Sequence, residues 1–197
     1  AMRFGNTAAV ETWKKKYAVA TDAADRLRLG LAVLNMSEWL DPSVFETMIA
    51  SSDALTKAMG EAGRAAASKK GVAPALINLV NQGHPLANAW VLAYAHQFAG
   101  ESDRHLILRA SIEAFEKSDD ASKARRLDEA VTALQLLYDK DPKVAEEVIT
   151  PILQNPADHK TMLQGALQVV IRNNKYEPQK LEIKLTKTNN DYKTNNN

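Results

Sequence analysis

The sequence contains no cysteine. Disulfide bonds, thiolate catalysis and cysteine-ligated zinc are therefore excluded together. A chain of 197 residues is long enough to bury a hydrophobic core without such cross-links. The lack of cysteine fits a cytoplasmic location, which is the location we expect.

Glycine is scarce, and the eight glycines are scattered along the chain. The sequence has no glycine-rich phosphate loop, dinucleotide fingerprint or nucleophile elbow. Its four histidines, His84, His96, His105 and His159, include no pair at the helical spacing of a metal site. We therefore expect no catalytic residue, cofactor or metal ligand, and hence no enzyme. An active site assembled from distant side chains stays open as an alternative, and it would require an enclosed polar pocket.

No apolar run approaches the ~20 residues of a membrane-spanning helix, so we expect no membrane span. Charge of one sign is also lacking, since 25 basic residues face 24 acidic ones. Residues 173–197 hold five lysines and three acidic residues, which leaves the rest of the chain nearly neutral. This balance gives little support to long-range attraction toward nucleic acid or acidic membranes.

Proline, although present only seven times, marks helix starts. The pairs Asp41-Pro42, His84-Pro85, Asp141-Pro142 and Asn155-Pro156 each place a potential cap before a residue that suits the first helical turn. Apolar side chains recur at helical period between these points. The chain is therefore predicted to be all-α, with helices at 7–19, 22–36, 42–50, 53–69, 73–82, 85–99, 103–117, 121–139, 142–154 and 157–172.

Two of these helices have distinct compositions. The consecutive apolar residues 90–95 predict that helix 85–99 is covered on most sides and lies centrally. Gly60, Gly63 and the run Ala65–Ala67 weaken helix 53–69 but favour close packing against it. Residues 1–172 are accordingly predicted to form one helical domain.

Residues 173–197 are rich in asparagine and lysine and too polar for a packed core. Within them Leu181, Ile183 and Leu185 alternate with charged residues, at the period of a strand. Two interpretations stay open: a flexible polar tail, or an extended segment that binds a partner.

An internal similarity appears at an offset of 57 residues, where Ala73 aligns with Ala130 and Pro85 with Pro142. The stretch from Leu136 through Asp141-Pro142 to Val144, followed by Val148 and Leu153, resembles a HEAT repeat over about 80 of the 197 residues. The offset exceeds the ~40 to 47 residues of that family, which implies an extra helix between units. The resemblance implies antiparallel helix pairs stacked as a short right-handed α-solenoid; an irregular helical bundle or a tetratricopeptide-like array is the alternative.

Helical arrays of this kind commonly bind other molecules, so the resemblance implies a non-catalytic protein-protein interaction scaffold or adaptor subunit. Its partner would be another protein or protein complex. Tryptophan is frequent at interface hot spots, and we select Trp13 and Trp39 as partner-binding candidates together with Leu181, Ile183 and Leu185. Trp13 is the stronger one, because it lies among lysines in the first helix, where a stack has no neighbour on one side.

The alternative function is nucleic-acid binding by a helical-repeat protein. It would require basic clusters from several helices to converge on one face and contact phosphates. The candidate contacts are Lys14, Lys15, Lys16, Arg104, Arg109, Lys123, Arg125 and Arg126.

Overall fold

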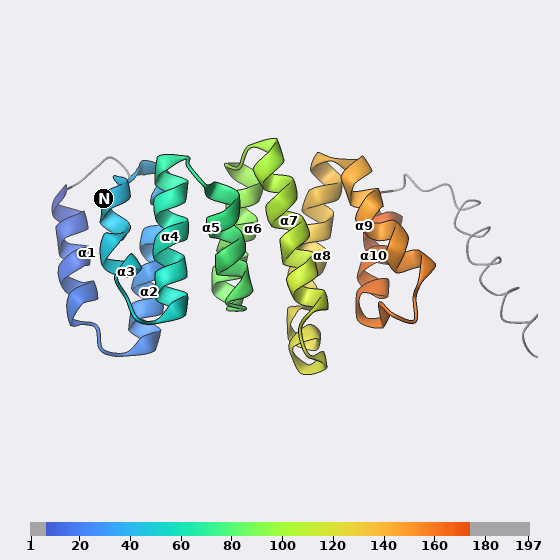
Figure 1. Ribbon diagram of the computed structural model, residues 1–197, viewed down its shortest axis with the longest axis horizontal. Helices are drawn as coiled ribbons and strands as arrows, with labels where there is room; N and C mark the ends of the chain where they lie inside the picture. Colours follow the sequence, from blue (N-terminus) through green and yellow to red (C-terminus); the bar gives the residue numbers. More distant parts are fainter. Residues whose placement is uncertain (1–6, 174–197) are drawn as a thin grey trace, which may run out of the picture. The chain divides into compact units, whose positions relative to one another are not determined.

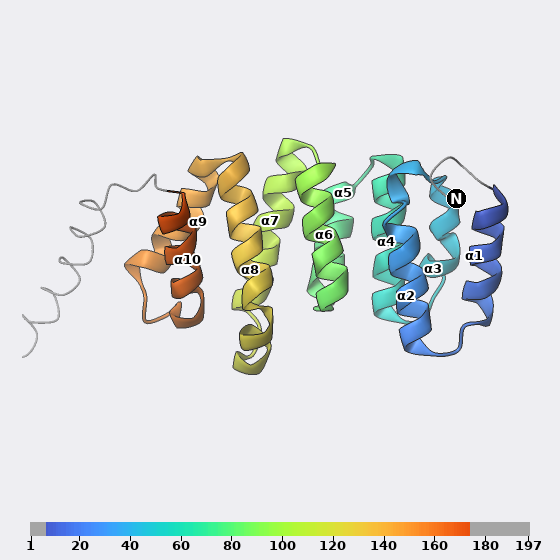
Figure 2. The same cartoon turned by 180° about the vertical axis from the view of Figure 1, so that it is seen from behind.

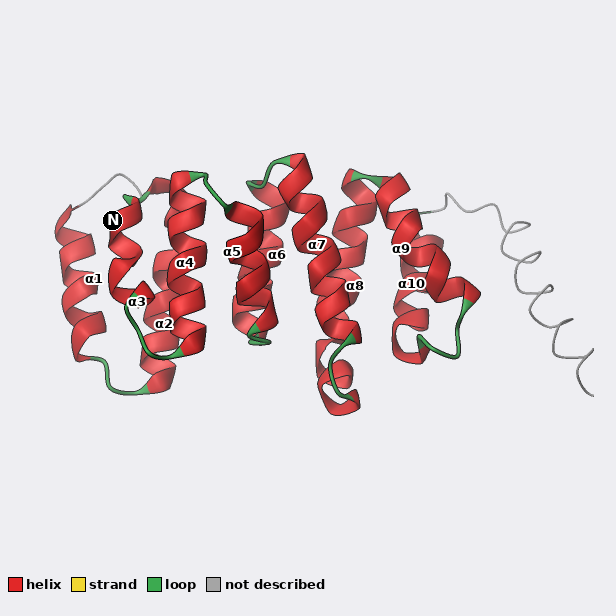
Figure 3. Ribbon diagram, in the orientation of Figure 1, coloured by secondary structure: helices red, strands yellow, loops and turns green. Residues whose placement is uncertain are grey.

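The structure of the chain is a computed structural model that describes residues 7–173, and all regular secondary structure in this range is helical (Figure 3). The all-α prediction is confirmed for these residues. They fall into two compact units, one ending at Ala114 and the next beginning at Phe115. The segment with Leu181, Ile183 and Leu185 lies outside the described residues, as does the side chain of Arg125.

The N-terminal unit contains most of the helices (Figure 1). They are α1 (Thr7–Val19), α2 (Ala23–Leu34), η2 (Ser37–Trp39), η3 (Pro42–Phe45), α3 (Glu46–Ile49), α4 (Ala54–Ser68), α5 (Val72–Asn81), α6 (Pro85–Gln97) and α7 (Glu101–Glu116), where η marks a 3-10 helix. The last two residues of α7 belong to the C-terminal unit, which continues with α8 (Asp120–Lys140), α9 (Pro142–Gln154) and α10 (Lys160–Arg172).

Aspartates begin several of these helices by accepting hydrogen bonds from backbone N–H groups that have no partner inside the helix. The carboxylate of Asp53 accepts from the N–H of Thr56 at 2.8 Å, and that of Asp119 accepts from the N–H of Ser122 at 2.9 Å. Prolines open η3, α6 and α9, as their missing N–H predicts.

Helix α4 is the centre of the N-terminal unit and packs on α2, η2, η3, α3 and α5. It lies in front of α2 in Figure 1, and α2 lies in front of it in the reverse view of Figure 2. Two glycines permit the close approach. A Cβ at Gly60 would lie 2.7 Å from the backbone nitrogen of Ile49, and one at Gly63 would lie 2.2 Å from the ring of Phe45. The close packing predicted for this helix is therefore present.

Helix α6 is buried on most sides, as its continuous apolar sequence predicts. Trp90, Val91, Leu92, Tyr94 and Ala95 are all buried, and the helix packs on α5 and α2. Because α6 is held by these two helices, the residues at its C-terminal end have a fixed position in the unit.

In the C-terminal unit, α8 packs against both α9 and α10, and α9 packs against α10. Leu134 and Leu137 of α8 and Ala166 of α10 are fully buried between them. Gly165 brings α10 close to α8, since a Cβ there would lie 2.4 Å from Val131. No helix within residues 7–173 is long and apolar enough to cross a membrane.

Candidate functional site

Two exposed aromatic side chains contact each other on the surface of the N-terminal unit. Trp39 is 41% exposed and Phe98 is 42% exposed, and their rings meet edge to face with centroids 6.2 Å apart. Soluble proteins usually bury tryptophan and phenylalanine, so two such rings side by side at the surface are a notable feature. Edge-to-face pairing also fixes the rings relative to each other.

The rings are held by the ends of different elements. Trp39 closes η2, where its N–H donates to the carbonyl of Met36 at 3.0 Å. Phe98 follows α6, and its N–H donates to the carbonyl of Tyr94 at 2.9 Å. The guanidinium of Arg104 donates to the carbonyls of Ala95 and Ala99 at 3.0 and 2.7 Å and so secures the end of α6.

A row of aromatic rings leads inward from this surface along α6. Phe98 lies 5.6 Å from Tyr94 and Tyr94 lies 5.4 Å from Trp90, measured between ring centroids. These residues are four apart in sequence and share one helix face. Since Trp90 and Tyr94 are buried, they support the exposed ring of Phe98 from below.

A cation and a carboxylate complete the arrangement. Lys69, the residue after α4, places Nζ 5.8 Å from the ring centroid of Tyr94 and 5.9 Å from that of Phe98. Its ammonium also forms an ion pair with Glu38, whose side chain is only 12% exposed. We call Glu38, Trp39, Lys69, Tyr94 and Phe98 the aromatic-charge cluster.

The electrostatics of the cluster are those of a shielded carboxylate. Burial first, and then the hydrogen bond and the negative charge of the neighbouring Glu38 carboxylate, raise the pKa of Tyr94. A shielded carboxylate is costly unless a cation or hydrogen-bond donors compensate it. Lys69 supplies this cation to one oxygen, Oε2. The other oxygen, Oε1, is buried, and the Tyr94 hydroxyl is a hydrogen-bonding neighbour of the same carboxylate.

Trp13 is not at the surface. It is 3% exposed, it stacks on Tyr17 with centroids 5.1 Å apart, and its indole N–H donates to the carbonyl of Leu29 at 2.9 Å. The side chain thus joins α1 to α2. This burial removes the physical basis for choosing Trp13 as a docking residue, whereas Trp39 has the exposure that docking requires.

The predicted basic residues of the N-terminal unit are partly occupied by structural contacts. Arg104 secures the end of α6, and Lys14 pairs with Glu11 at 3.1 Å. Lys15 and Lys16 on α1 are exposed, and so is Arg109 on α7.

In the C-terminal unit, Arg126 pairs with Glu129 at 3.4 Å and donates to the hydroxyl of Ser118 at 3.2 Å. Lys123 lines a hollow of about 480 Å³ that also includes Glu116 and His159, whose side chains lie 2.7 Å apart. Arg126 is thus committed to contacts within its own unit, which leaves fewer free cations for phosphates than the sequence indicates.

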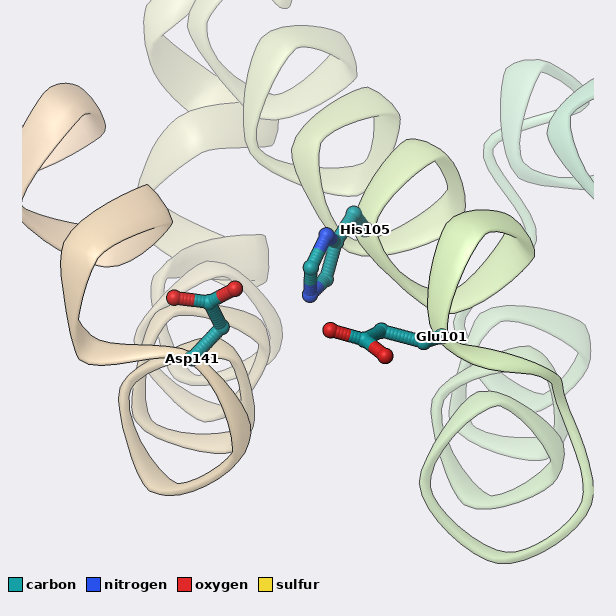
Figure 4. Close-up of side chains that lie close together, drawn as sticks. All are labelled: Glu101, His105 and Asp141. Carbon is teal, nitrogen blue, oxygen red and sulfur yellow. The ribbon is translucent and has the colours of Figure 1, made fainter.

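Figure 4 shows Glu101 and His105, one turn apart on α7, and Asp141 before α9. Glu101 and His105 belong to the N-terminal unit, and each offers one atom that could bind a metal ion. Asp141 belongs to the C-terminal unit, where its carboxylate accepts from the N–H groups of Lys143 and Val144 at 3.1 and 3.3 Å and caps α9. The three side chains thus belong to two different units, and we assign no metal site to them.

Sequence reasoning selected Trp39 but missed the rest of the aromatic-charge cluster. The spacing of Trp90, Tyr94 and Phe98 is a signal that could have found the aromatic row.

Comparisons of the chain with protein-family profiles, curated protein sequences and solved structures gave no match.

Proposed function

We propose that this chain is a non-catalytic protein-interaction scaffold or adaptor, which binds a partner protein through the aromatic-charge cluster. The observation that carries the proposal is the exposed pair Trp39 and Phe98. Rigid aromatic anchors with charged neighbours are typical of interface hot spots, because they bury a large area at a small entropic cost. The exposed rings are supported from below by buried rings, so these rings need little reorganisation to bind.

We further propose that the helices form HEAT-like antiparallel pairs in a short right-handed α-solenoid. The 57-residue similarity supports this, since Pro85 and Pro142 each open the second helix of a pair, α6 and α9. Ala73 and Ala130, in the preceding helices α5 and α8, are both buried. Equivalent positions thus have equivalent structural roles, as repeated units require.

The arrangement of α8 and α10 also supports a stack. Gly165 faces Val131, and Asn173 hydrogen-bonds to Gln135 at 3.4 Å, so the two helices run in the same direction. With α9 joining them, α8 and α9 would form one antiparallel pair and α10 would begin the next.

Affinity purification from the native cell tests the interaction. The bait is the full chain, and it is compared with the double variant Trp39→Ala/Phe98→Ala. Leu86→Ala/Leu106→Ala is the matched control, since both leucines are exposed and lie outside the cluster. Truncating both rings is expected to cost at least about 2 kcal/mol, or roughly thirtyfold in affinity, if they are hot spots.

The expected result is one protein identified by mass spectrometry that the cluster variant loses and the leucine variant keeps. The purified partner must then bind the purified full chain directly with the same pattern. Equal capture by all three baits would overturn the proposed role of the cluster.

The same purification decides between the interaction function and the nucleic-acid alternative. Nuclease-sensitive recovery that falls steeply with salt would favour nucleic-acid binding through exposed cations such as Lys15 and Lys16. A chain truncated after Asn174 tests the proposed second contact by Leu181, Ile183 and Leu185. Loss of the protein partner on truncation would support that contact.

A further inference from the structure

We propose that the aromatic-charge cluster is a receptor for an arginine side chain of the partner protein, and that Lys69 occupies this receptor in the unbound chain. The inference rests on the proposed interaction function, because it assigns the partner's chemistry at the same surface. Its essential elements are the carboxylate of Glu38, the rings around it, and a resident cation.

The position of Lys69 identifies the kind of ligand that fits. Its ammonium lies at nearly equal distances, 5.8 and 5.9 Å, from two ring centroids and pairs with Glu38. Aromatic faces attract cations within about 6 Å of the ring centroid, and a shielded carboxylate requires one. The cluster therefore has the composition of a cation site.

Lys69 is suited to being replaced. Its side chain is 54% exposed, so the ammonium can turn into water without crossing packed structure. Its backbone adopts a left-handed conformation with φ of 56°, which is unusual for a residue other than glycine and costs some stability. The exchange of one cation for another also leaves Glu38 compensated, so no charge becomes buried without a partner.

Arginine fits the cluster better than the resident lysine. An ammonium is a point charge, whereas a guanidinium presents a planar fork of donors that matches both oxygens of a carboxylate. Lys69 pairs with Oε2 of Glu38 alone, whereas a guanidinium fork carries a second donor for the same carboxylate. Guanidinium also stacks on aromatic faces, and Trp39 and Phe98 are exposed beside the site.

The test removes the resident cation in the full chain. Lys69→Ala is titrated with N-acetyl-arginine amide, and binding is followed by nitrogen-edited NMR. The three tryptophans give three indole N–H signals, and the one that Trp39→Phe removes belongs to Trp39. Lys69→Asn is the second variant, because asparagine tolerates the left-handed backbone and guards against a folding defect in the alanine variant.

We expect Lys69→Ala to bind the arginine probe about tenfold more tightly than the unmodified chain, since a charge-assisted pair contributes the ~1.4 kcal/mol of a tenfold change. N-acetyl-lysine amide should bind more weakly, and the neutral isostere N-acetyl-citrulline amide should not shift the Trp39 signal. Adding Glu38→Gln to Lys69→Ala should abolish the gain.

Equal binding of the arginine and citrulline probes, or a gain that survives Glu38→Gln, would overturn the inference. Lysine binding as tight as arginine binding would overturn the arginine assignment. Because the probe replaces the partner, failure here is distinct from failure of the interaction function. The interaction function fails if the full chain captures no protein partner, and the role of the cluster in it fails if Trp39→Ala/Phe98→Ala keeps the partner.

Discussion

The substitution Gly63→Ala should destabilise the N-terminal unit, although alanine is the better helix former. Alanine in place of glycine gains about 1 kcal/mol in a helix interior. The new Cβ, however, would lie 2.2, 2.4 and 2.8 Å from three atoms of the Phe45 ring. Carbon atoms pack at about 3.5–4.0 Å, so the ring must move by more than an ångström.

Phe45 has no space into which to move, because its side chain is fully buried. Overpacking of this kind typically costs 1–3 kcal/mol, and the short contacts place Gly63→Ala at or above about 3 kcal/mol. After the gain in helix propensity is subtracted, the expected net loss of unfolding free energy is about 2 kcal/mol.

Urea unfolding followed by tryptophan fluorescence measures this loss. Trp13, Trp39 and Trp90 all precede Ala114, so fluorescence reports on the N-terminal unit. Lys57→Ala, at an exposed position of α4, is the control and should change stability by less than about 0.5 kcal/mol.

A double-substitution cycle tests the steric cause directly. In Phe45→Leu the smaller side chain makes room for the new methyl group, so Gly63→Ala should cost at least about 0.5 kcal/mol less in that background. If Gly63→Ala is as stable as the unmodified chain, or if the two costs simply add, the reasoning from close packing fails.

Four further substitutions have definite expected outcomes. Trp13→Ala should cost about 3–5 kcal/mol, as removal of a buried tryptophan does, whereas the exposed Trp39→Ala should cost less than about 1 kcal/mol, both read from urea unfolding by circular dichroism. Hydrogen bonds from Thr56 lower the pKa of Asp53, so this cap stabilises the fold above the unfolded value of 3.8 and is lost as pH falls through the lower folded pKa. Asparagine at position 53 can also cap the helix but does not titrate. The free energy of unfolding of Asp53→Asn should therefore approach that of the unmodified chain as the pH falls from neutral to about 3. Pro151 lies inside α9 without a backbone donor, so Pro151→Ala should raise the melting temperature, with a gain of about 1 kcal/mol by circular dichroism.

Helix positions could be predicted from the sequence because caps and prolines act locally. Pro42, Pro85 and Pro142 each open a helix where expected. Two details differ. The predicted helix 42–50 is divided into the 3-10 helix η3 and the short α3. Pro156 does not open α10, which starts at Lys160. A turn precedes this helix, in which the N–H of Asp158 donates a hydrogen bond to the carbonyl of Asn155.

The aromatic-charge cluster could not be predicted in full, since its members come from three separate segments. Glu38 lies on η2, a three-residue element too short to show any periodicity. Lys69 looks like one of several surface lysines, and its role depends on the left-handed turn after α4. Only the row of rings on α6 repeats at helical spacing, and a buried packing stripe would show the same spacing.

The two predicted anchor tryptophans show which sequence signal decides burial. The sequence predicts an available Trp13 because it lies among lysines in the first helix, where a stack has no neighbour on one side, yet Val10, Trp13 and Tyr17 recur at three and four residues, and all three are buried. Lys15 and Lys16 lie on the other faces of the same helix and carry no information about the indole. Trp39 instead lies on η2, a three-residue 3-10 helix, and is 41% exposed. Membership of a periodic stripe within a long helix, rather than the charge of adjacent residues, therefore indicates that Trp13 is buried.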